Sequence, residues 1–252
     1  MIFFRAEGLA KHFGGIKAID GISFEVKQGE IFTLIGPNGA GKTTIFNLVS
    51  RIYEPTSGRL IFLDEDITAV PPHEIAKRGI ARTFQNIELF EYASVLQNLL
   101  LGRHAHKGSN FLGEVLFLPK VRRLELEHRE AAEKVIDFLD LQPYRDSLIA
   151  NLPYGVRKVV ELARALCTEP KLLLLDEPSS GLNVEETQDM AFWIQDIKEL
   201  LGITVLMVEH DMTLVGAVSD RVLALSNGRP LALGTADEVQ ANADVIAAYL
   251  GS

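Results

Sequence analysis

The fold of this chain is decided by one stretch of its sequence, Gly36-Pro37-Asn38-Gly39-Ala40-Gly41-Lys42-Thr43-Thr44. The stretch matches the pattern G-x-x-x-x-G-K-[ST] at every fixed position. A β-type run, Ile31–Ile35, precedes it, and a helical run, Thr44–Ile52, follows it. A strand, a glycine-rich loop and a helix in this order predict a loop that binds the phosphates of a nucleoside triphosphate, within an α/β fold.

The residue types in the loop explain why phosphates are the expected ligand. Glycines at positions 36, 39 and 41 let the backbone curl, so that its N–H groups converge on phosphate oxygens. The N-terminus of the following helix adds roughly half a positive charge. Lys42 supplies a charge for the β and γ phosphates, and the Thr43 hydroxyl can ligate Mg²⁺. The residues expected to contact the nucleotide are Gly36, Asn38, Gly39, Ala40, Gly41, Lys42, Thr43 and Thr44.

Bulk composition narrows the setting of this loop. The 252 residues suffice for one large domain or for two small domains that pack closely. No apolar run approaches the roughly 18 residues that a bilayer span needs, and the N-terminus lacks the features of a signal peptide. The single cysteine, Cys167, excludes an internal disulfide and is typical of a reducing cytosol. A net charge of −9 argues against affinity for nucleic acids or anionic membranes, so any membrane role is expected to come through a partner protein.

Apolar β-type runs alternate with amphipathic helical runs, as in an α/β domain with a largely parallel sheet. The expected strands of this sheet are Ile31–Ile35, Leu172–Leu175, Thr204–Glu209 and Arg221–Ser226. Asn227-Gly228 predicts a tight hairpin turn into a further strand, Pro230–Leu233. Thr235 and Glu238 form the pattern of a capping box, which predicts a short C-terminal helix.

The N-terminal and middle parts depart from this alternation. Short strands separated by glycine-rich turns predict an antiparallel sheet near the N-terminus, namely Ile2–Glu7, Ile22–Val26 and Arg59–Leu63. From about Tyr92 to Cys167 the pattern is mostly helical, with an irregular loop at His104–Phe117 that carries an apolar cluster. We therefore expect a nucleotide-binding core with an antiparallel β subdomain at residues 1–90 and 166–252, and an inserted helical subdomain at residues 91–165.

Two adjacent acids, Asp176 and Glu177, directly follow the apolar run Leu172–Leu175. Asp176 at the end of the strand can reach the magnesium shell, and Glu177 can lie at the γ-phosphate to orient and activate water. A kinase is expected to carry an acceptor-binding lid and a GTPase a guanine-reading N-K-x-D motif. Neither feature is apparent in the sequence, which favours the other classes of phosphate-loop protein.

Two further polar residues follow expected strands, since Gln85 ends the run Ile80–Gln85 and His210 follows Thr204–Glu209. Together with Phe13, the phosphate loop and the acid pair, they make the chain resemble the ABC-type ATPases over essentially its whole length. These ATPases are the nucleotide-binding subunits of ABC transporters. The resemblance implies a RecA-like phosphate-loop NTPase core and a helical subdomain that contacts a membrane partner.

The resemblance also implies roles for single residues. Phe13 stacks on the adenine of ATP, Gln85 reaches Mg²⁺ and senses the γ-phosphate, and His210 contacts that phosphate. The implied catalytic set is Glu177, His210 and Lys42, and the implied magnesium ligands are Thr43, Gln85 and Asp176. The implied loop facing a second subunit is Ser180-Gly181-Leu182-Asn183.

Several segments are similar to one branch of the family, the ATPases of branched-chain amino acid importers, in the larger of two paired subunit types. These segments are Arg82-Thr83-Phe84-Gln85, Gly181-Leu182-Asn183, Glu209-His210-Asp211-Met212, the loop around Phe111–Phe117 and the ending Val245–Gly251. The expectation that the solute is a branched-chain amino acid rests on this similarity alone.

The chain departs from the family at its signature, Leu-Ser-Gly-Gly-Gln, where it has Leu152-Pro153-Tyr154-Gly155-Val156. In the family this segment grips the γ-phosphate of the opposite subunit, so Pro153, Tyr154 and Gly155 are the expected contacts to the partner's ATP. Pro153 offers neither a hydroxyl nor an N–H. The loss of one charge-assisted hydrogen bond weakens the binding of phosphate by roughly 1.5–3 kcal/mol. Proline nevertheless suits the first turn of a helix. We expect a heterodimer with two unequal sites.

The sequence thus predicts the ATP- and Mg²⁺-dependent ATPase subunit of an importer, peripheral on the cytoplasmic face of the inner membrane. Its expected partners are a second ATPase subunit, transmembrane permease subunits and, indirectly, a periplasmic or extracellular solute-binding protein, with no nucleic acid. One alternative is a transport ATPase of the same branch for urea, another amide or a lipid such as lipopolysaccharide. Others are a soluble ABC ATPase acting on DNA or ribosomes, and a module that holds ATP without turnover.

Overall fold

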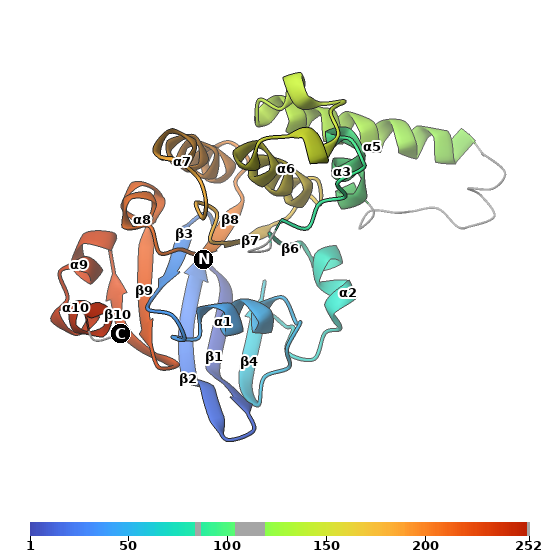
Figure 1. Ribbon diagram of the computed structural model, residues 1–252. Helices are drawn as coiled ribbons and strands as arrows, with labels where there is room; N and C mark the ends of the chain where they lie inside the picture. Colours follow the sequence, from blue (N-terminus) through green and yellow to red (C-terminus); the bar gives the residue numbers. More distant parts are fainter. Residues whose placement is uncertain (84–86, 104–118, 251–252) are drawn as a thin grey trace. The chain divides into compact units, whose positions relative to one another are not determined.

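The computed structural model describes residues 1–83, 87–103 and 119–250, and the chain divides into two compact units (Figure 1). The first unit combines residues 1–85 and 171–252, and the second comprises residues 86–170. The first unit is therefore discontinuous in sequence, with the second inserted into it. None of the helices in the described ranges combines the length and the apolar character that a bilayer span needs.

The N-terminal strands of the first unit form an antiparallel sheet, as the sequence predicts. Its order is β2-β1-β4-β5, with the bounds β1 (Ile2–Phe13), β2 (Ile16–Lys27), β4 (Ser57–Phe62) and β5 (Glu65–Asp66). Strands β1 and β2 are longer than expected. The reason is that Gly8 and Gly21, with φ of 55° and 75°, lie inside these strands instead of ending them, and the β1–β2 register shifts between Ala6 and Leu9.

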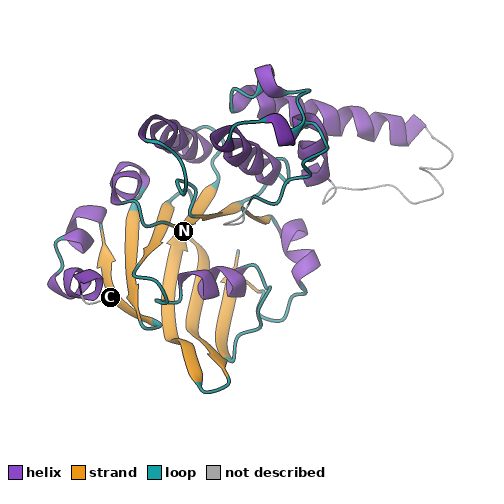
Figure 2. Cartoon of the chain, in the orientation of Figure 1, coloured by secondary structure: helices purple, strands orange, loops and turns teal. Residues whose placement is uncertain are grey.

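The second sheet of this unit is largely parallel, also as predicted (Figure 2). Its order is β10-β9-β3-β8-β7-β6, and only the β9–β10 pair is antiparallel among its described pairs. The bounds are β3 (Ile31–Ile35), β6 (Ile80–Arg82), β7 (Leu172–Asp176), β8 (Thr204–Val208), β9 (Arg221–Ser226) and β10 (Arg229–Gly234). Asn227 and Gly228 close the β9–β10 hairpin with φ of 48° and 72°, the positive values that a two-residue turn needs.

Every residue of β3, β7 and β8 is buried, because both faces of the parallel sheet are covered. One hydrophobic core joins this sheet to the antiparallel sheet through helix α1 (Lys42–Val49). A smaller core joins Ile35 and β9 to α8 (Met212–Val218), α9 (Ala236–Gln240) and α10 (Ala243–Leu250). The expected capping box of Thr235 and Glu238 is present at the start of α9.

The remaining elements of this unit are the short α2 (Pro72–Ile75) and η1 (Ala76–Arg78) and the longer α7 (Val184–Glu199). Helix α7 begins with a capping box in which Asn183 and Glu186 bind each other's backbone N–H groups. The predicted loop Ser180–Asn183 therefore ends in a fixed helix start.

The second unit is helical, as the pattern from Tyr92 to Cys167 predicts. Its elements are α3 (Val95–Gly102), α5 (Pro119–Phe138), η3 (Gln142–Tyr144), η4 (Ile149–Asn151) and α6 (Tyr154–Leu166). The buried amide of Asn98 fixes the start of this unit, because it accepts a hydrogen bond from Phe90 N and donates to Phe90 O and Ser94 O. The predicted loop His104–Phe117, with its apolar cluster, lies outside the described residues.

Candidate nucleotide-binding site

The parallel sheet brings three of the predicted groups to one edge. Strands β3, β8 and β7 lie side by side, and their carboxyl ends point the same way. The phosphate loop follows β3, Asp176 ends β7 with Glu177 directly after it, and Glu209 and His210 follow β8. Residues more than 130 positions apart in sequence thus meet at the carboxyl edge, where open α/β sheets bind their ligands.

The glycines of the phosphate loop are required by its conformation. Gly36 and Gly41 have φ of 151° and 102°. A Cβ on Gly36 would lie 2.3 Å from Leu225 O, and a Cβ on Gly41 would lie 2.5 Å from Ile19 Cδ1. Helix α1 begins at Lys42, two residues earlier than predicted, and Gly41 gives it no side-chain cap. The N–H groups of its first turn are therefore left for a ligand such as phosphate.

The side chain of Lys42 curls over the loop that precedes it. Its ammonium donates to Gly36 O at 2.5 Å and to Pro37 O at 3.1 Å. Burial lowers the pKa of Lys42, while the nearby carboxylates of Glu177 and Asp176 raise it. The positive charge and the two acids of the predicted site are therefore close enough to interact.

Asp176 is held by an arginine that the sequence analysis did not assign to the site. Arg82 Nη2 lies 2.8 Å from Asp176 Oδ2, and the two side chains are only 8% and 2% exposed. Arg82 Nη1 also donates to Asn47 Oδ1 at 2.7 Å and to Ser50 Oγ at 2.9 Å. Asn47 lies in α1, and Ser50 is the C-cap of that helix. The signal for this role is a charged residue at the end of β6, directly after the apolar Ile80 and Ala81.

Glu177 adopts a backbone conformation that is unusual for its residue type. Its φ is 50°, in the left-handed region, and its N–H donates to Val208 O at 2.9 Å. His210 Nδ1 lies 4.0 Å from Glu177 Oε2, so the predicted base and the predicted phosphate-contacting histidine are neighbours. Strained conformations of this kind are concentrated at functional sites.

Phe13, the residue predicted to stack on adenine, is partly exposed. The ring is 43% exposed and packs edge-on against Tyr53, with centroids 5.3 Å apart and an interplanar angle of 75°. Lys11 Nζ lies 5.1 Å from the centroid of Phe13. Tyr53 therefore supports the ring, a role that the sequence analysis missed because the two residues lie 40 positions apart.

The C-terminal helix α10 also reaches the phosphate loop. Burial raises the pKa of Tyr249, and a hydrogen bond with the backbone of Gly36 lowers it in part. Val245 of the same helix joins the core cluster that contains Ile35, the residue before the loop. The ending Val245–Leu250 is thus packed on the strand that carries the site, as far as the structure describes it.

The predicted contacts to a second subunit lie in separate units of the chain. In the second unit, Pro153 is the N-cap of α6 with φ −55° and ψ 154°, so it precedes the helix and does not occupy its first turn. Tyr154 is exposed and Gly155 is buried. In the first unit, the loop Ser180–Asn183 is fixed by bonds from Ser180 N to Glu177 O and from Leu182 N to Ser179 O. Gln85 lies outside the described residues.

The donor set of this edge fits Mg²⁺ bound together with phosphates. Thr43 is exposed beside the loop, and Asp176 is a carboxylate at the same edge. Among the described residues no group of three His, Cys, Asp or Glu side chains could hold a metal by itself. Magnesium normally takes one or two protein ligands plus substrate phosphates and water, which is what these residues offer.

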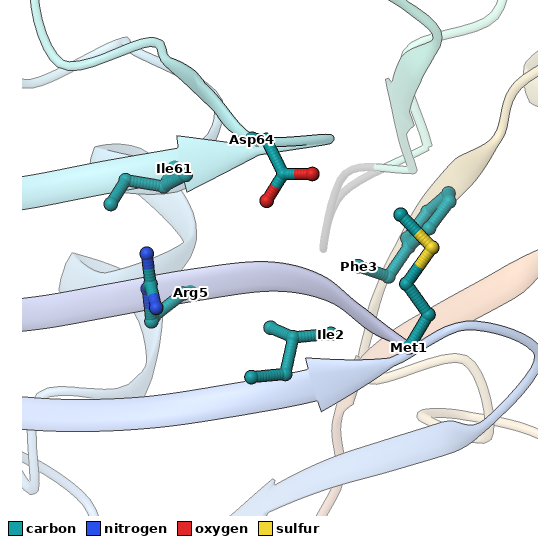
Figure 3. A pocket seen from close by; sticks show the side chains of 6 residues that line it. All are labelled: Met1, Ile2, Phe3, Arg5, Ile61 and Asp64. Carbon is teal, nitrogen blue, oxygen red and sulfur yellow. The ribbon is translucent and has the colours of Figure 1, made fainter.

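A pocket of ≈ 220 Å³ lies on the antiparallel sheet (Figure 3). It is lined by Met1, Ile2, Phe3, Arg5, Ile61 and Asp64. Arg5 faces Glu7 at 2.9 Å, so its charge is already compensated. The pocket shares no residue with the phosphate loop or with the acid pair.

Comparisons with known proteins agree with this arrangement. The profile of the ABC transporter family matches residues 19–180. A second profile, described as branched-chain amino acid ATP-binding cassette transporter, matches residues 229–252. Together the two matched ranges cover the phosphate loop, the acid pair and the C-terminal helix.

The chain is similar over nearly its full length to proteins named for amino acid transport. The high-affinity branched-chain amino acid transport ATP-binding protein BraF of Pseudomonas aeruginosa is 41% identical over 244 residues, which is 97% of this chain and 96% of that protein. LivG of Escherichia coli, with the same descriptive name, is 38% identical over the same shares.

Solved structures match the fold across the whole chain. An ATP-binding cassette of an ABC transporter in its ADP conformation has a TM-score of 0.87 and 34% identity, with 100% of both chains covered. A nucleotide-free ATP-binding cassette from an ABC transporter has a TM-score of 0.85 and 32% identity, again over 100% of both chains. The predicted fold class is confirmed.

Proposed function

Since this chain belongs to the ABC transporter family and is an ATPase subunit of such a transporter, we propose that it powers the import of branched-chain amino acids. The ATPase activity is supported above all by one observation, the meeting of the phosphate loop, the acid pair and His210 at one sheet edge. The choice of solute is supported by the names of the relatives and by the profile match at residues 229–252.

The proposed reaction is in-line attack of water on the γ-phosphate of ATP. Glu177 accepts the proton of the attacking water, and His210 and Gln85 position the reacting groups. Lys42 and the loop amides neutralise the charge that develops on the phosphate oxygens. Thr43, Gln85 and Asp176 would hold Mg²⁺, which would supply further positive charge to the phosphates. Phe13 stacks on the adenine.

The remaining loop residues complete the proposed ATP site. The phosphates are surrounded by the backbone N–H groups of these residues and by Thr44. The residues are Gly36, Asn38, Gly39, Ala40, Gly41 and Thr43. The proposed core is made of residues 1–90 and 166–252, and the proposed helical subdomain of residues 91–165. These limits differ by several residues from the division of the structure at 85 and 170.

We propose a heterodimer with two unequal ATP sites. The loop Ser180-Gly181-Leu182-Asn183 faces the second ATPase subunit, and Pro153, Tyr154 and Gly155 touch the partner's ATP. Because Pro153 has no N–H or hydroxyl, the partner's site is the weaker one. Single-turnover hydrolysis with Glu177→Gln in this chain alone tests the assignment. If the activity of the heterodimer is unchanged, the assignment is wrong.

The family implies permease partners and a location at the membrane. We propose that the chain lies on the cytoplasmic face of the inner membrane, where its helical subdomain docks on transmembrane permease subunits. A solute-binding protein outside the membrane completes the system. The candidate docking segment is Asn86–Phe90, of which Asn86 lies outside the described residues and Phe90 is 61% exposed.

Purification of the full chain with its membrane partners tests the solute directly. ATP hydrolysis by the reconstituted complex should rise when a branched-chain amino acid and the solute-binding protein are both added. If hydrolysis rises instead with urea, another amide or lipopolysaccharide, that compound is the transported solute and the proposed solute is wrong. The absence of any membrane partner would favour a soluble ABC ATPase, and ATP binding without turnover would favour a regulatory module.

A further inference from the structure

Glu209 is a buried carboxylate that the proposed reaction does not use. It follows β8, and its side chain is 0% exposed. Its own N–H continues the sheet by donating to Leu34 O of β3 at 3.3 Å. An ionised carboxylate in such a position requires strong compensation, because burial without hydrogen bonds is very costly.

Four hydrogen bonds provide this compensation. Oε1 accepts from Ser179 Oγ at 2.9 Å, from His210 N at 2.9 Å and from Asp211 N at 3.1 Å. Oε2 accepts from Ser179 N at 3.3 Å. Hydrogen bonds to an ionised acceptor are stronger than bonds between neutral groups. These four bonds therefore hold the carboxylate in a fixed position.

The donors come from two loops, and Ser179 in the first loop lies 30 residues before Glu209 in sequence. Ser179 follows the acid pair and directly precedes the loop Ser180–Asn183, and it binds the carboxylate through both its backbone and its side chain. His210 and Asp211 form the other loop, in which Asp211 caps helix α8 by accepting from Thr213 N and Leu214 N. Glu209 thus bonds to both loops through one side chain.

The imidazole of His210 lies next to the same carboxylate. Its Nδ1 is 3.5 Å from Glu209 Oε1 and 4.0 Å from Glu177 Oε2. The backbone of His210 therefore bonds to Glu209, while its ring nitrogen Nδ1 lies within 4.0 Å of both Glu209 and the proposed base. A displacement of Ser179 would be transmitted through one side chain to the residue proposed to contact the γ-phosphate.

We propose that Glu209 is a positioning residue that couples the loop Ser180–Asn183 to His210. When a second subunit moves that loop, the carboxylate moves the histidine with it, so that hydrolysis depends on assembly. This inference rests on the roles proposed above for His210 and for Ser180–Asn183. It adds a residue whose side chain is fully buried in this chain.

Ser179→Ala and Glu209→Gln test the coupling from its two ends. Ser179→Ala removes the hydroxyl donor, and Glu209→Gln keeps the side-chain volume but faces Ser179 N–H with an amide donor. Each should lower kcat of the full chain, assembled with its co-purified subunits, about tenfold, the loss expected for one hydrogen bond to a charged group. KM for ATP should not change, because both side chains are buried and bonded to each other. Ser179→Thr, which keeps the hydroxyl, should retain activity.

The double variant and a matched control separate coupling from general damage. Ser179→Ala combined with Glu209→Gln should be no slower than the slower single variant, because both break one link. Ser219→Ala removes a partly buried hydroxyl elsewhere in the same unit, bonded to Thr33 at 2.7 Å, and should leave kcat unchanged. Additive losses in the double variant, or an equal loss in Ser219→Ala, would overturn the coupling.

Hydrogen exchange of the full chain gives a second readout that needs no turnover. Ser179→Ala should speed exchange of the amides of His210 and Asp211, in the other loop, whereas Ser219→Ala should not. Unchanged exchange there would also overturn the inference, even if Glu209→Gln failed to fold. His210→Ala tests the proposed function separately. If it stays active, the role of the histidine is wrong, whereas an inactive His210→Ala beside active Ser179 and Glu209 variants rejects only the coupling.

Discussion

Asp176 and Glu177 are adjacent in sequence, yet their side chains lie in different surroundings. The carboxylate of Asp176 is buried and is bound by the guanidinium of Arg82. Glu177 is turned by its positive φ toward His210. One residue of displacement at the end of a strand thus separates a fixed charge from a group that can accept a proton.

Arg82→Leu should destabilise the protein by about 3 kcal/mol, because it removes the partner of a buried carboxylate. It also removes the bonds from Arg82 to Asn47 and Ser50. Urea unfolding of the full chain measures the loss. Arg59→Leu breaks an ion pair with Glu7 on the exposed face of the antiparallel sheet and should cost less than about 1 kcal/mol. Equal losses for the two variants would contradict this account.

Cys167 should not react with thiol reagents in the folded chain. Burial raises the pKa of this thiol from its ordinary value of 9.0 to about 12, and the thiolate is the reactive form. Ellman's reagent at pH 8 should therefore label the chain only after denaturation.

The same pKa shift has a defined sign for stability. The folded state retains the proton of Cys167 that the unfolded state loses above pH 9, so this contribution is complete below pH 9 and is lost as the pH rises toward 12. Cys167→Ala should show a smaller fall in unfolding free energy between these values. Identical slopes for the two proteins would contradict the shift.

The phosphate loop tolerates change unequally along its length. Gly36→Ala should destabilise the nucleotide-free protein strongly, because the new Cβ would lie 2.3 Å from Leu225 O and the backbone would have to move. Gly39→Ala should cost only about 1–2 kcal/mol, since Gly39 has φ of 81° but a Cβ there meets nothing within 4 Å. Thermal unfolding without nucleotide compares them, and a Gly39→Ala loss as large as that of Gly36→Ala would be the contrary result.

Elements defined by local patterns could be predicted from the sequence. Strands β3 and β9 have the predicted bounds, because each is an apolar run between clear breaks. The ends of β1 and β2 could not be predicted, because a glycine inside a strand and a glycine in a turn have the same local signal. The predicted antiparallel pairing was nevertheless confirmed.

The motif residues of the site could also be predicted, but not the residues that hold them. Arg82 and Glu209 belong to contacts that join different strands, so their roles depend on the strand order β3-β8-β7-β6. Tyr53 and Tyr249 likewise meet their partners only in the folded chain. The sequence marks residues that bind a ligand, while supporting contacts depend on the tertiary structure.

The whole chain should assemble in a nucleotide-dependent way. Glu177→Gln, mixed with the second ATPase subunit, should elute as a dimer with ATP and as separate subunits with ADP, because hydrolysis no longer removes the shared γ-phosphate. Size-exclusion chromatography with light scattering measures this. Adding Lys42→Ala to the same variant should weaken the dimer. The change removes the ammonium that lies in the loop and is proposed to bind the β and γ phosphates. Elution that ignores the nucleotide would contradict the assembly.

The central place of β3 in its sheet affects how the protein folds during its synthesis on the ribosome. Both neighbours of β3 are encoded late, since β8 begins at Thr204 and β9 at Arg221, about 170 residues or more after β3 ends. At a synthesis rate of about 5–20 residues per second, this apolar strand waits roughly 10–30 seconds for its partners. Throughout that interval the nascent chain exposes Ile31–Ile35 and has no finished nucleotide site. The chain should therefore need chaperones until its last fifth, which contains β8 and β9, has been translated.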